Sequence, residues 1–349
     1  MSDKKQFSYD EKEVTYENKS AGITLAGTFT APSSAEKHPA VLLVSGMGAM
    51  DRDGTFYGHK PMLMVADYLT KHGICVLRFD KRGVGKSTGT FDLNVTSNDL
   101  ANDVLAGIEY LKTCPEVNTK QIGLIGFSEG GFISSMVASR SKDVSFIALM
   151  SGAVANDIES MVEQSATQLR FDGASPDIIE KDGAIRKQVL EIVTSQTDAL
   201  KAEKQLRELL DGYWNQLTEQ QKSEANTLLF AFSKPKFDAQ ISTYNSPWYR
   251  FYLGYTTTNA LSNISVPVLA INGEFDFMPP RLIFPIIRNA MNKADNKDHT
   301  LLELPNLNHA MKTCKTGSIA EYATLEEAIS PRVLQAVTDW IIKRTITAN

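Results

Sequence analysis

Short, continuous runs of apolar residues recur along this chain, and they restrict its possible folds more than any other feature. Between them lie longer stretches, such as 60–73 and 97–113, in which apolar residues recur every three to four positions. Continuous apolar runs are typical of strands buried on both faces, and the longer periodicity is typical of amphipathic helices. Strands alternating with helices predict an α/β protein with a mostly parallel, doubly wound sheet. The apolar runs are AVLLVSG (40–46), ICVLRFD (74–80), QIGLIGFS (121–128), VSFIALMSG (144–152), VPVLAING (266–273) and HTLLELP (299–305).

Two segments depart from this alternation. Residues 12–30 alternate in the manner of strands on either side of the turn KSAG, which predicts an antiparallel hairpin at the N-terminus. Residues 157–232 carry charged, amphipathic helical patterns. We expect a core domain of residues 9–155 and 245–347, with 156–244 inserted as a helical cap over the carboxyl edge of the sheet, where such sheets bind ligands. The alternative is a helical appendage that only adds stability.

Charge and composition exclude several classes of partner. The formal net charge is −5, and lysines and arginines are scattered, which argues against nucleic acid or an anionic membrane as the main partner. No apolar stretch reaches the ~18 residues of a transmembrane segment, and the N-terminus is polar. We therefore expect a cytoplasmic protein, although a periplasmic or secreted protein whose signal peptide had been removed would have the same sequence. The three cysteines fit neither a disulfide framework nor a metal site, and nothing indicates the oligomeric state.

The stretch GVGKST at 83–88 has the end of a phosphate-binding loop but not its beginning. The full motif requires a glycine five positions before Gly85, and Asp80 occupies that position. We therefore expect no nucleotide, and the sequence indicates no other cofactor and no metal.

The pentapeptide GFSEG at 126–130 matches G-x-S-x-G, and it lies between a predicted strand and a predicted helix. In that context the motif predicts a sharp turn that exposes Ser128 above the sheet edge as a nucleophile. The N-terminus of the following helix directs free N–H groups towards the same place, which favours a developing negative charge.

A serine nucleophile needs a base, and the base needs a group that orients it. With this motif the acid and the histidine follow the serine in that order. Asp276 and His309 each lie just after a predicted strand, so we expect them to complete a triad with Ser128. Glu274 is the nearest competitor to Asp276 for the acidic position.

An oxyanion would need two N–H donors, and we expect them from the backbones of Glu129 and Met47. Further candidates for substrate contact are Phe127 and the aromatic segment 247–252, in particular Trp248, although core packing explains much of that segment equally well. The negative charge of Glu129 gives the hypothesis that anionic substrates are repelled.

These motifs resemble the α/β-hydrolase superfamily, in particular serine esterases and the related serine aminopeptidase-like and dienelactone hydrolase-like proteins. The resemblance runs through nearly the whole chain outside 157–235, and one departure is Ser45-Gly46 where many lipases have His-Gly. The segments that carry the resemblance are VSGMGAMDRDG, RFDKRGVGKS, GLIGFSEGG, LAINGEFDFMPP and LNHAMKTCKTGSIAEY.

The resemblance implies an α/β-hydrolase fold and hydrolysis of a small-molecule ester, with short acyl groups preferred. It also implies that RFDKRGVGKS is a structural loop in which Asp80 and Arg82 bind neighbouring segments and Lys86 faces solvent. Residues 51–54, DRDG, either contact substrate or form a turn. Amide or peptide hydrolysis by the same triad is the first alternative, and a non-catalytic binding protein of this fold is the second.

Overall fold

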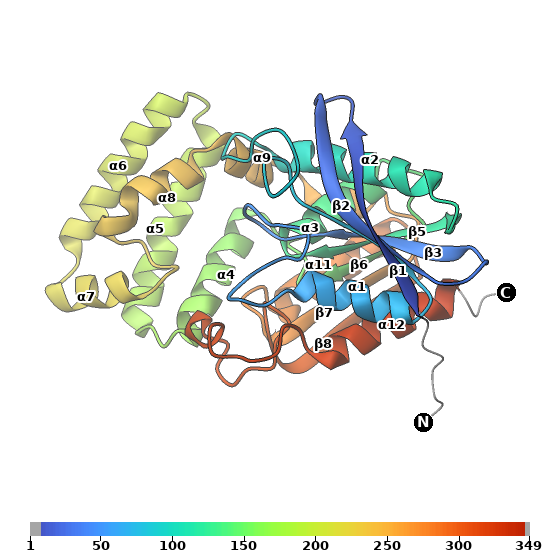
Figure 1. Ribbon diagram of the computed structural model, residues 1–349. Helices are drawn as coiled ribbons and strands as arrows, with labels where there is room; N and C mark the ends of the chain where they lie inside the picture. Colours follow the sequence, from blue (N-terminus) through green and yellow to red (C-terminus); the bar gives the residue numbers. More distant parts are fainter. Residues whose placement is uncertain (1–7, 346–349) are drawn as a thin grey trace.

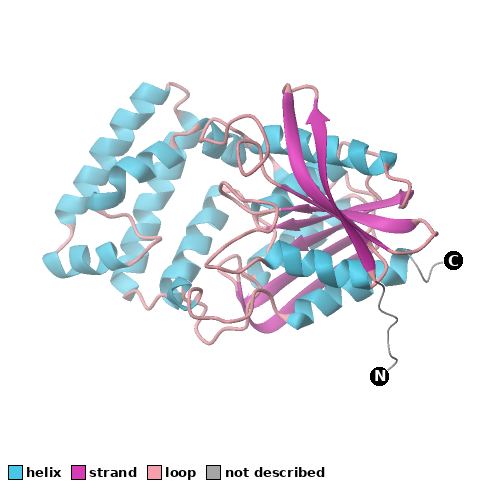
Figure 2. Ribbon diagram, viewed as in Figure 1, coloured by secondary structure: helices cyan, strands magenta, loops and turns pink. Residues whose placement is uncertain are grey.

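An eight-stranded sheet forms the centre of the protein in a computed structural model that describes residues 8–345 (Figures 1 and 2). The strand order is β1-β2-β4-β3-β5-β6-β7-β8; the β1–β2 and β2–β4 pairs are antiparallel, and all the other pairs are parallel. This confirms the predicted α/β-hydrolase sheet and its N-terminal hairpin. The strands are β1 (Tyr9–Asn18), β2 (Ile23–Pro32), β3 (His38–Val44), β4 (Cys75–Phe79), β5 (Val117–Phe127), β6 (Phe146–Met150), β7 (Val268–Phe275) and β8 (His299–Asn308).

Helices cover both faces of the sheet, which is why its central strands are apolar throughout. In β3, Leu42 packs into the apolar core on one face and Leu43 into the core on the other, because successive side chains of a strand point to opposite faces. All three cysteines are buried as free thiols. One core contains side chains of α2 (Ser97–Thr113), α3 (Glu129–Ala138), α10 (Thr257–Leu261) and α11 (Pro280–Lys293), and the other contains those of α1 (Pro61–Lys71) and α12 (Pro331–Thr345).

The chain between β6 and β7 is helical, and it extends beyond one end of the sheet (Figure 1). These helices enclose two apolar clusters of their own, one of which contains Leu190, Leu206 and Phe232. None of the helices between residues 8 and 345 is long and apolar enough to cross a membrane. Besides α10, the helices between β6 and β7 are α4 (Ile158–Phe171), α5 (Pro176–Ser195), α6 (Ala199–Gln216), α7 (Glu219–Thr227), α8 (Phe237–Tyr244) and α9 (Pro247–Gly254); short 3₁₀ turns lie at Lys234–Lys236 and, later in the chain, Ile319–Glu321.

A buried asparagine joins the two ends of this helical insertion. The side-chain amide of Asn156 donates hydrogen bonds to the carbonyl oxygens of Tyr252 and Tyr255, the latter at 2.7 Å. Its oxygen accepts a hydrogen bond from the Thr257 hydroxyl at 2.9 Å. The polypeptide therefore leaves and re-enters the sheet region at one place.

Candidate active site

Ser128 lies at the sharp turn between β5 and α3. Its backbone has φ 53° and ψ −119°, a strained conformation for a residue other than glycine. Close packing around the turn holds it there. A Cβ at Gly126 would lie 2.3 Å from the carbonyl oxygen of Gly130, and a Cβ at Gly130 would lie 2.0 Å from that of Val44. The two glycines of the motif therefore permit the contact between strand, turn and helix.

The imidazole of His309 lies between Ser128 and Asp276. Its Nε2 is 3.0 Å from Oγ of Ser128, and its Nδ1 is 2.7 Å from Oδ1 of Asp276. The three side chains come from the turns that follow β5, β7 and β8, so the parallel sheet brings together residues that are far apart in sequence. The aspartate is fully buried, and the imidazole is nearly so.

The structure distinguishes Asp276 from its competitor, Glu274. Oδ1 of Asp276 also accepts the backbone N–H of Met278 at 2.8 Å, and Oδ2 accepts the side-chain amide of Asn272 at 3.1 Å. Glu274 is exposed and instead accepts the backbone N–H of Asn306 at 3.0 Å. Only Asp276 is therefore held in contact with the histidine.

The loop after β3 lies directly against the serine. A Cβ at Gly46 would lie 3.2 Å from Cβ of Ser128, so no side chain fits there without movement. Within residues 8–345, the hydrogen bonds leave the backbone N–H groups of Met47 and Glu129 without an acceptor. Two free N–H groups beside a nucleophile are what an oxyanion requires. The thioether side chain of Met47 has no hydrogen to donate, so only its backbone is suited to this role.

A cavity of about 350 Å³ opens onto Ser128 and His309, and its walls are mostly apolar. Phe127, a predicted substrate contact, contributes to the wall, and the centre of the Phe277 ring lies 4.2 Å from that of His309. Unbranched, polarisable methionine side chains let such a wall adapt to the shape of its ligand. Methionines and phenylalanines make up much of the lining, among them Met47, Met50, Met62, Met150, Met311 and Phe230.

Trp248 does not lie among the residues that line this cavity. Its indole N–H donates to Oε1 of Glu129 at 2.7 Å, and the hydroxyl of Ser97 donates to the same oxygen at 2.8 Å. Oε2 of Glu129 lies 3.7 Å from the ammonium of Lys81, and both side chains are buried. The hypothesis that Glu129 repels anionic substrates is therefore wrong, because its charge is enclosed and paired.

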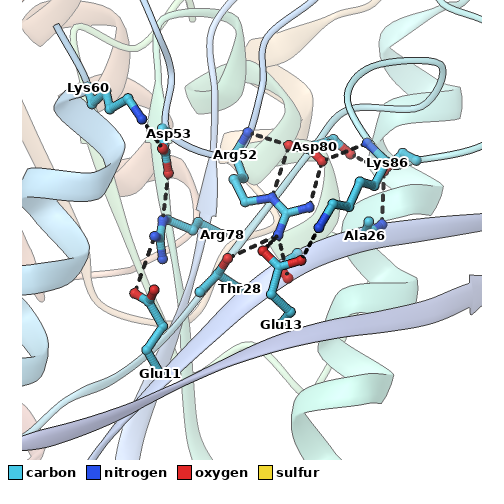
Figure 3. Close-up of polar contacts among 12 residues, drawn as sticks. Glu11, Glu13, Ala26, Thr28, Arg52, Asp53, Lys60, Arg78, Asp80 and Lys86 are labelled. Atoms are coloured by element: carbon cyan, nitrogen blue, oxygen red, sulfur yellow. Dashed lines mark hydrogen bonds and ion pairs between the residues drawn. The ribbon is translucent and has the colours of Figure 1, made fainter.

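The side chains of the loop at 51–54 anchor it to the sheet (Figure 3). Nη2 of Arg52 lies 2.7 Å from Oδ2 of Asp80, and Oδ1 of Asp53 accepts a hydrogen bond from Nε of Arg78 at 3.0 Å. Burial alone would raise the pKa of Asp80, but its hydrogen bonds, chiefly from Arg52, hold that pKa below its usual value. The charged side chains thus form a structural turn, while Gly54 lines the cavity.

The resemblance of residues 83–88 to a phosphate-binding loop has a structural explanation. Oδ2 of Asp80 accepts the backbone N–H of Lys86 at 3.0 Å, and a Cβ at Gly85 would lie 2.5 Å from the same oxygen. Arg82 pairs with Asp103 at 2.7 Å. The side chain of Lys86 is 72% exposed. The expected scaffold role of Asp80 and Arg82, with Lys86 facing solvent, is confirmed.

Sequence reasoning missed much of the cavity wall. Phe56 precedes α1, and Leu229 and Phe230 come from the helical insertion, yet all three line the cavity. Phe277, which also lines the cavity, is the only one of the missed residues with a local signal, because it directly follows Asp276. Phe56, Leu229 and Phe230 belong to no motif, because their role depends on how distant loops meet above the sheet.

The sheet order, the serine turn and the hydrogen-bonded serine, histidine and aspartate together define an α/β hydrolase. A sequence model of the X-Pro dipeptidyl-peptidase (S15) family matches residues 21–284. The chain belongs to this family.

Individual relatives are more distant. The esterase EstD of Thermotoga maritima is 28% identical over 180 residues, which cover 52% of this chain and 41% of the esterase. The structure of the α/β hydrolase GrgF from Penicillium sp. sh18 matches 96% of this chain and 98% of its own, with a TM-score of 0.56 and 18% identity. The esterase Pf2001 from Pyrococcus furiosus matches 97% of this chain and 92% of its own, with a TM-score of 0.53 and 18% identity. At these identities the two structures establish the fold alone.

Proposed function

We propose that the protein hydrolyses carboxylic esters through a triad of Ser128, His309 and Asp276. One observation carries the proposal: a continuous hydrogen-bonded relay from the serine hydroxyl through the imidazole to a buried carboxylate, at the wall of an apolar cavity. The sequence similarity to the esterase EstD supports the same reaction. A non-catalytic binding protein would have no need of this relay.

In the proposed mechanism, Oγ of Ser128 attacks the ester carbonyl carbon while Nε2 of His309 accepts the hydroxyl proton. The carbonyl electron pair moves to oxygen, and the backbone N–H groups of Met47 and Glu129 stabilise that charge. The intermediate collapses with cleavage of the carbon–oxygen bond, and His309 gives its proton to the departing alcohol. Water then attacks the acyl-serine while Nε2 of His309 accepts one of its protons. The imidazole returns this proton to Oγ of Ser128 as the acid is released. Asp276 orients the imidazole and stabilises its charged form.

The cavity supports the proposal that the substrates are small, uncharged esters with short acyl groups. Its volume of about 350 Å³ lies near the lower end of the range for small-molecule sites, roughly 300–1,000 Å³. The apolar wall favours hydrocarbon groups. We further propose that residues 156–244 act as a cap that helps to select the substrate, since Leu229 and Phe230 from this segment line the cavity.

Amide or peptide hydrolysis is the alternative that the family description raises. Release of dipeptides from an amino terminus would require a group that binds the substrate's positive α-ammonium. Among the described residues, no aspartate or glutamate lines the cavity, and the lysine that does, Lys312, carries the wrong charge for this purpose. This lining favours esters over peptides with a free amino terminus.

The test is hydrolysis of p-nitrophenyl esters from acetate to decanoate, with p-nitroacetanilide as the amide. We expect ester turnover greatest for short acyl groups, and its loss by at least about 1,000-fold in Ser128→Ala. Ser134→Ala is a matched control, because this serine is buried in α3 with no hydrogen-bond partner for its hydroxyl among the described residues. Turnover that survives Ser128→Ala would exclude the proposed mechanism. Faster cleavage of the amide would favour the alternative.

A further inference from the structure

A buried lysine lies directly behind the loop that carries the proposed oxyanion donor. Lys81 follows β4 by two residues and is only 3% exposed. Its ammonium donates a hydrogen bond to the carbonyl oxygen of Gly46 at 2.5 Å and lies 3.7 Å from Oε2 of Glu129. The ring of Phe91 covers it, with the nitrogen 5.3 Å from the ring centre. The ammonium is thus enclosed between the oxyanion loop, the start of α3 and an aromatic ring.

The hydrogen bond from Lys81 determines the orientation of one peptide group. The carbonyl of Gly46 and the N–H of Met47 belong to the same trans peptide and point in opposite directions. With the carbonyl held towards Lys81, the N–H of Met47 points to the opposite side of the loop. Gly46 lies against Ser128 and lines the cavity.

This peptide needs an external restraint, because glycine leaves its own backbone free to rotate. Rotation of the Gly46–Met47 peptide would bring the carbonyl oxygen towards the nucleophile. A carbonyl there would repel the negative charge that develops on the substrate oxygen. Rotation would also leave the ammonium of Lys81 buried without its hydrogen bond, which carries a large free-energy cost.

We propose that Lys81 is a positioning residue that fixes the Gly46–Met47 peptide for oxyanion stabilisation, and that Glu129 and Trp248 hold Lys81 in place. The inference rests on the proposed function. Glu129 takes part twice: its backbone N–H is the second oxyanion donor, and its carboxylate pairs with Lys81. One buried ion pair therefore links the two donors.

The network continues into the helical insertion. Trp248 lies in the first turn of α9, at the end of the insertion, and donates from its indole to Glu129 at 2.7 Å. Its backbone N–H donates to the carbonyl oxygen of Leu93 at 3.0 Å, which anchors this turn to the core. The geometry of the oxyanion loop is thus connected to the base of the insertion through Trp248, Glu129 and Lys81.

A role in stability alone accounts poorly for this network. Buried ion pairs often contribute little to folding, because removing both charges from water costs as much as their attraction returns. Burial lowers the pKa of Lys81, and the neighbouring carboxylate of Glu129 acts in the opposite direction. Positioning of the oxyanion loop therefore explains this charged pair better than stabilisation of the core does.

The test compares Lys81→Met with the wild type in kcat, KM and the inhibition constant of a trifluoromethyl ketone. This inhibitor adds to the serine hydroxyl and, like the transition state, places a negative oxygen between the donors. We expect kcat to fall by about 10–100-fold, part of the ~100–1,000-fold typical for complete loss of one donor. KM should change less than twofold, and the inhibition constant should rise by the same factor as kcat falls.

Two further sets of variants keep the test independent of folding. Lys81→Met combined with Glu129→Gln removes both charges, so no carboxylate is left buried and unpaired, and it should show the same loss of kcat. Trp248→Phe should lower kcat by about two- to fivefold. Trp340→Phe in α12, which removes a comparable indole hydrogen bond to Thr300 of β8, should not lower kcat.

The outcomes separate the two proposals. An active wild type whose Lys81→Met variant keeps its kcat, or loses kcat without loss of affinity for the ketone, overturns the positioning role and leaves the esterase proposal standing. A wild type that neither hydrolyses esters nor reacts with a fluorophosphonate overturns both.

Discussion

Replacing Asp276 by asparagine should lower kcat by about 1,000-fold while leaving the fold intact. Oδ1 of Asp276 accepts two hydrogen bonds, from Nδ1 of His309 and from the N–H of Met278. An acceptor must therefore remain at that position, and the new amide nitrogen should take the place of Oδ2. Asn272 donates to Oδ2 in the wild type, so its amide must turn and present its unpaired Oδ1 to the new N–H. The imidazole then keeps its orientation and tautomer. What it loses is the negative charge that stabilises its protonated form.

The magnitude follows from the separation of the charges. Two unit charges about 4 Å apart attract by about 4 kcal/mol at an effective dielectric constant of about 20. Since about 1.4 kcal/mol corresponds to a tenfold change in rate, the loss is close to 1,000-fold. Asp276 is fully buried, so solvent does not screen this interaction. If the amide rotated and presented its N–H to Nδ1, His309 would adopt the wrong tautomer, and the loss would approach about 10,000-fold.

The measurement is steady-state hydrolysis of p-nitrophenyl acetate, together with thermal unfolding of each variant. Glu274→Gln is the matched control, because this acid lies two residues away and is exposed, and among residues 8–345 its carboxylate bonds only to the backbone of Asn306. Its kcat should stay within about twofold of the wild type. A loss of less than tenfold in Asp276→Asn, with unchanged thermal stability, would refute the argument that this carboxylate stabilises the imidazolium.

Three further predictions test other parts of the structure. Gly46→Ala should lower kcat by about tenfold with little change in melting temperature, because its Cβ would press on Ser128 at 3.2 Å; an unchanged kcat would show that the loop can move freely. Burial raises the pKa of the Cys75 thiol to about 12, so native protein at pH 8 should not react there with Ellman's reagent, whereas unfolded protein should; rapid labelling of native Cys75 would contradict this. Asp80→Asn should cost about 3 kcal/mol of unfolding free energy at pH 7, because it leaves the buried guanidinium of Arg52 without its buried carboxylate partner. Because folding lowers the pKa of Asp80, this stabilisation is complete above the normal aspartate pKa of about 3.9 and is lost as the pH falls through the lower pKa of the folded protein. Urea unfolding at a series of pH values should therefore show the unfolding free energies of wild type and variant converging in acid. A difference that does not change with pH would contradict this prediction.

The strand pattern and the serine motif were enough to predict the sheet and the relative position of the candidate triad. Both depend on local features, namely a period of two or 3.6 residues and a turn that only certain residues allow. The order of Ser128, Asp276 and His309 along the chain then located the other two members, because strands of a parallel sheet end at the same edge.

Contacts between distant segments were not predictable in the same way. Trp248 was expected to contact substrate, but its indole instead bonds to Glu129, which is 119 positions away. The charge of Glu129 looked available to substrate because nothing in its neighbourhood in sequence indicates that Lys81 pairs with it. The cavity wall depends likewise on loops that meet only in the folded protein.

The hydrogen bonds of Asn156 make the helical insertion a module. Because this side chain joins the start of the insertion to its end, strands β6 and β7 are connected by what is in effect a short link, whatever the length of polypeptide beyond it. Even a free loop would add only about 0.6 kcal/mol of closure cost for each doubling of its length. Evolution or design can therefore exchange helices α4 to α8, and with them Leu229 and Phe230, provided that α9 keeps Trp248 against Glu129. In a protein built this way, part of the cavity wall can change while the hydrogen-bonded serine, histidine and aspartate stay the same.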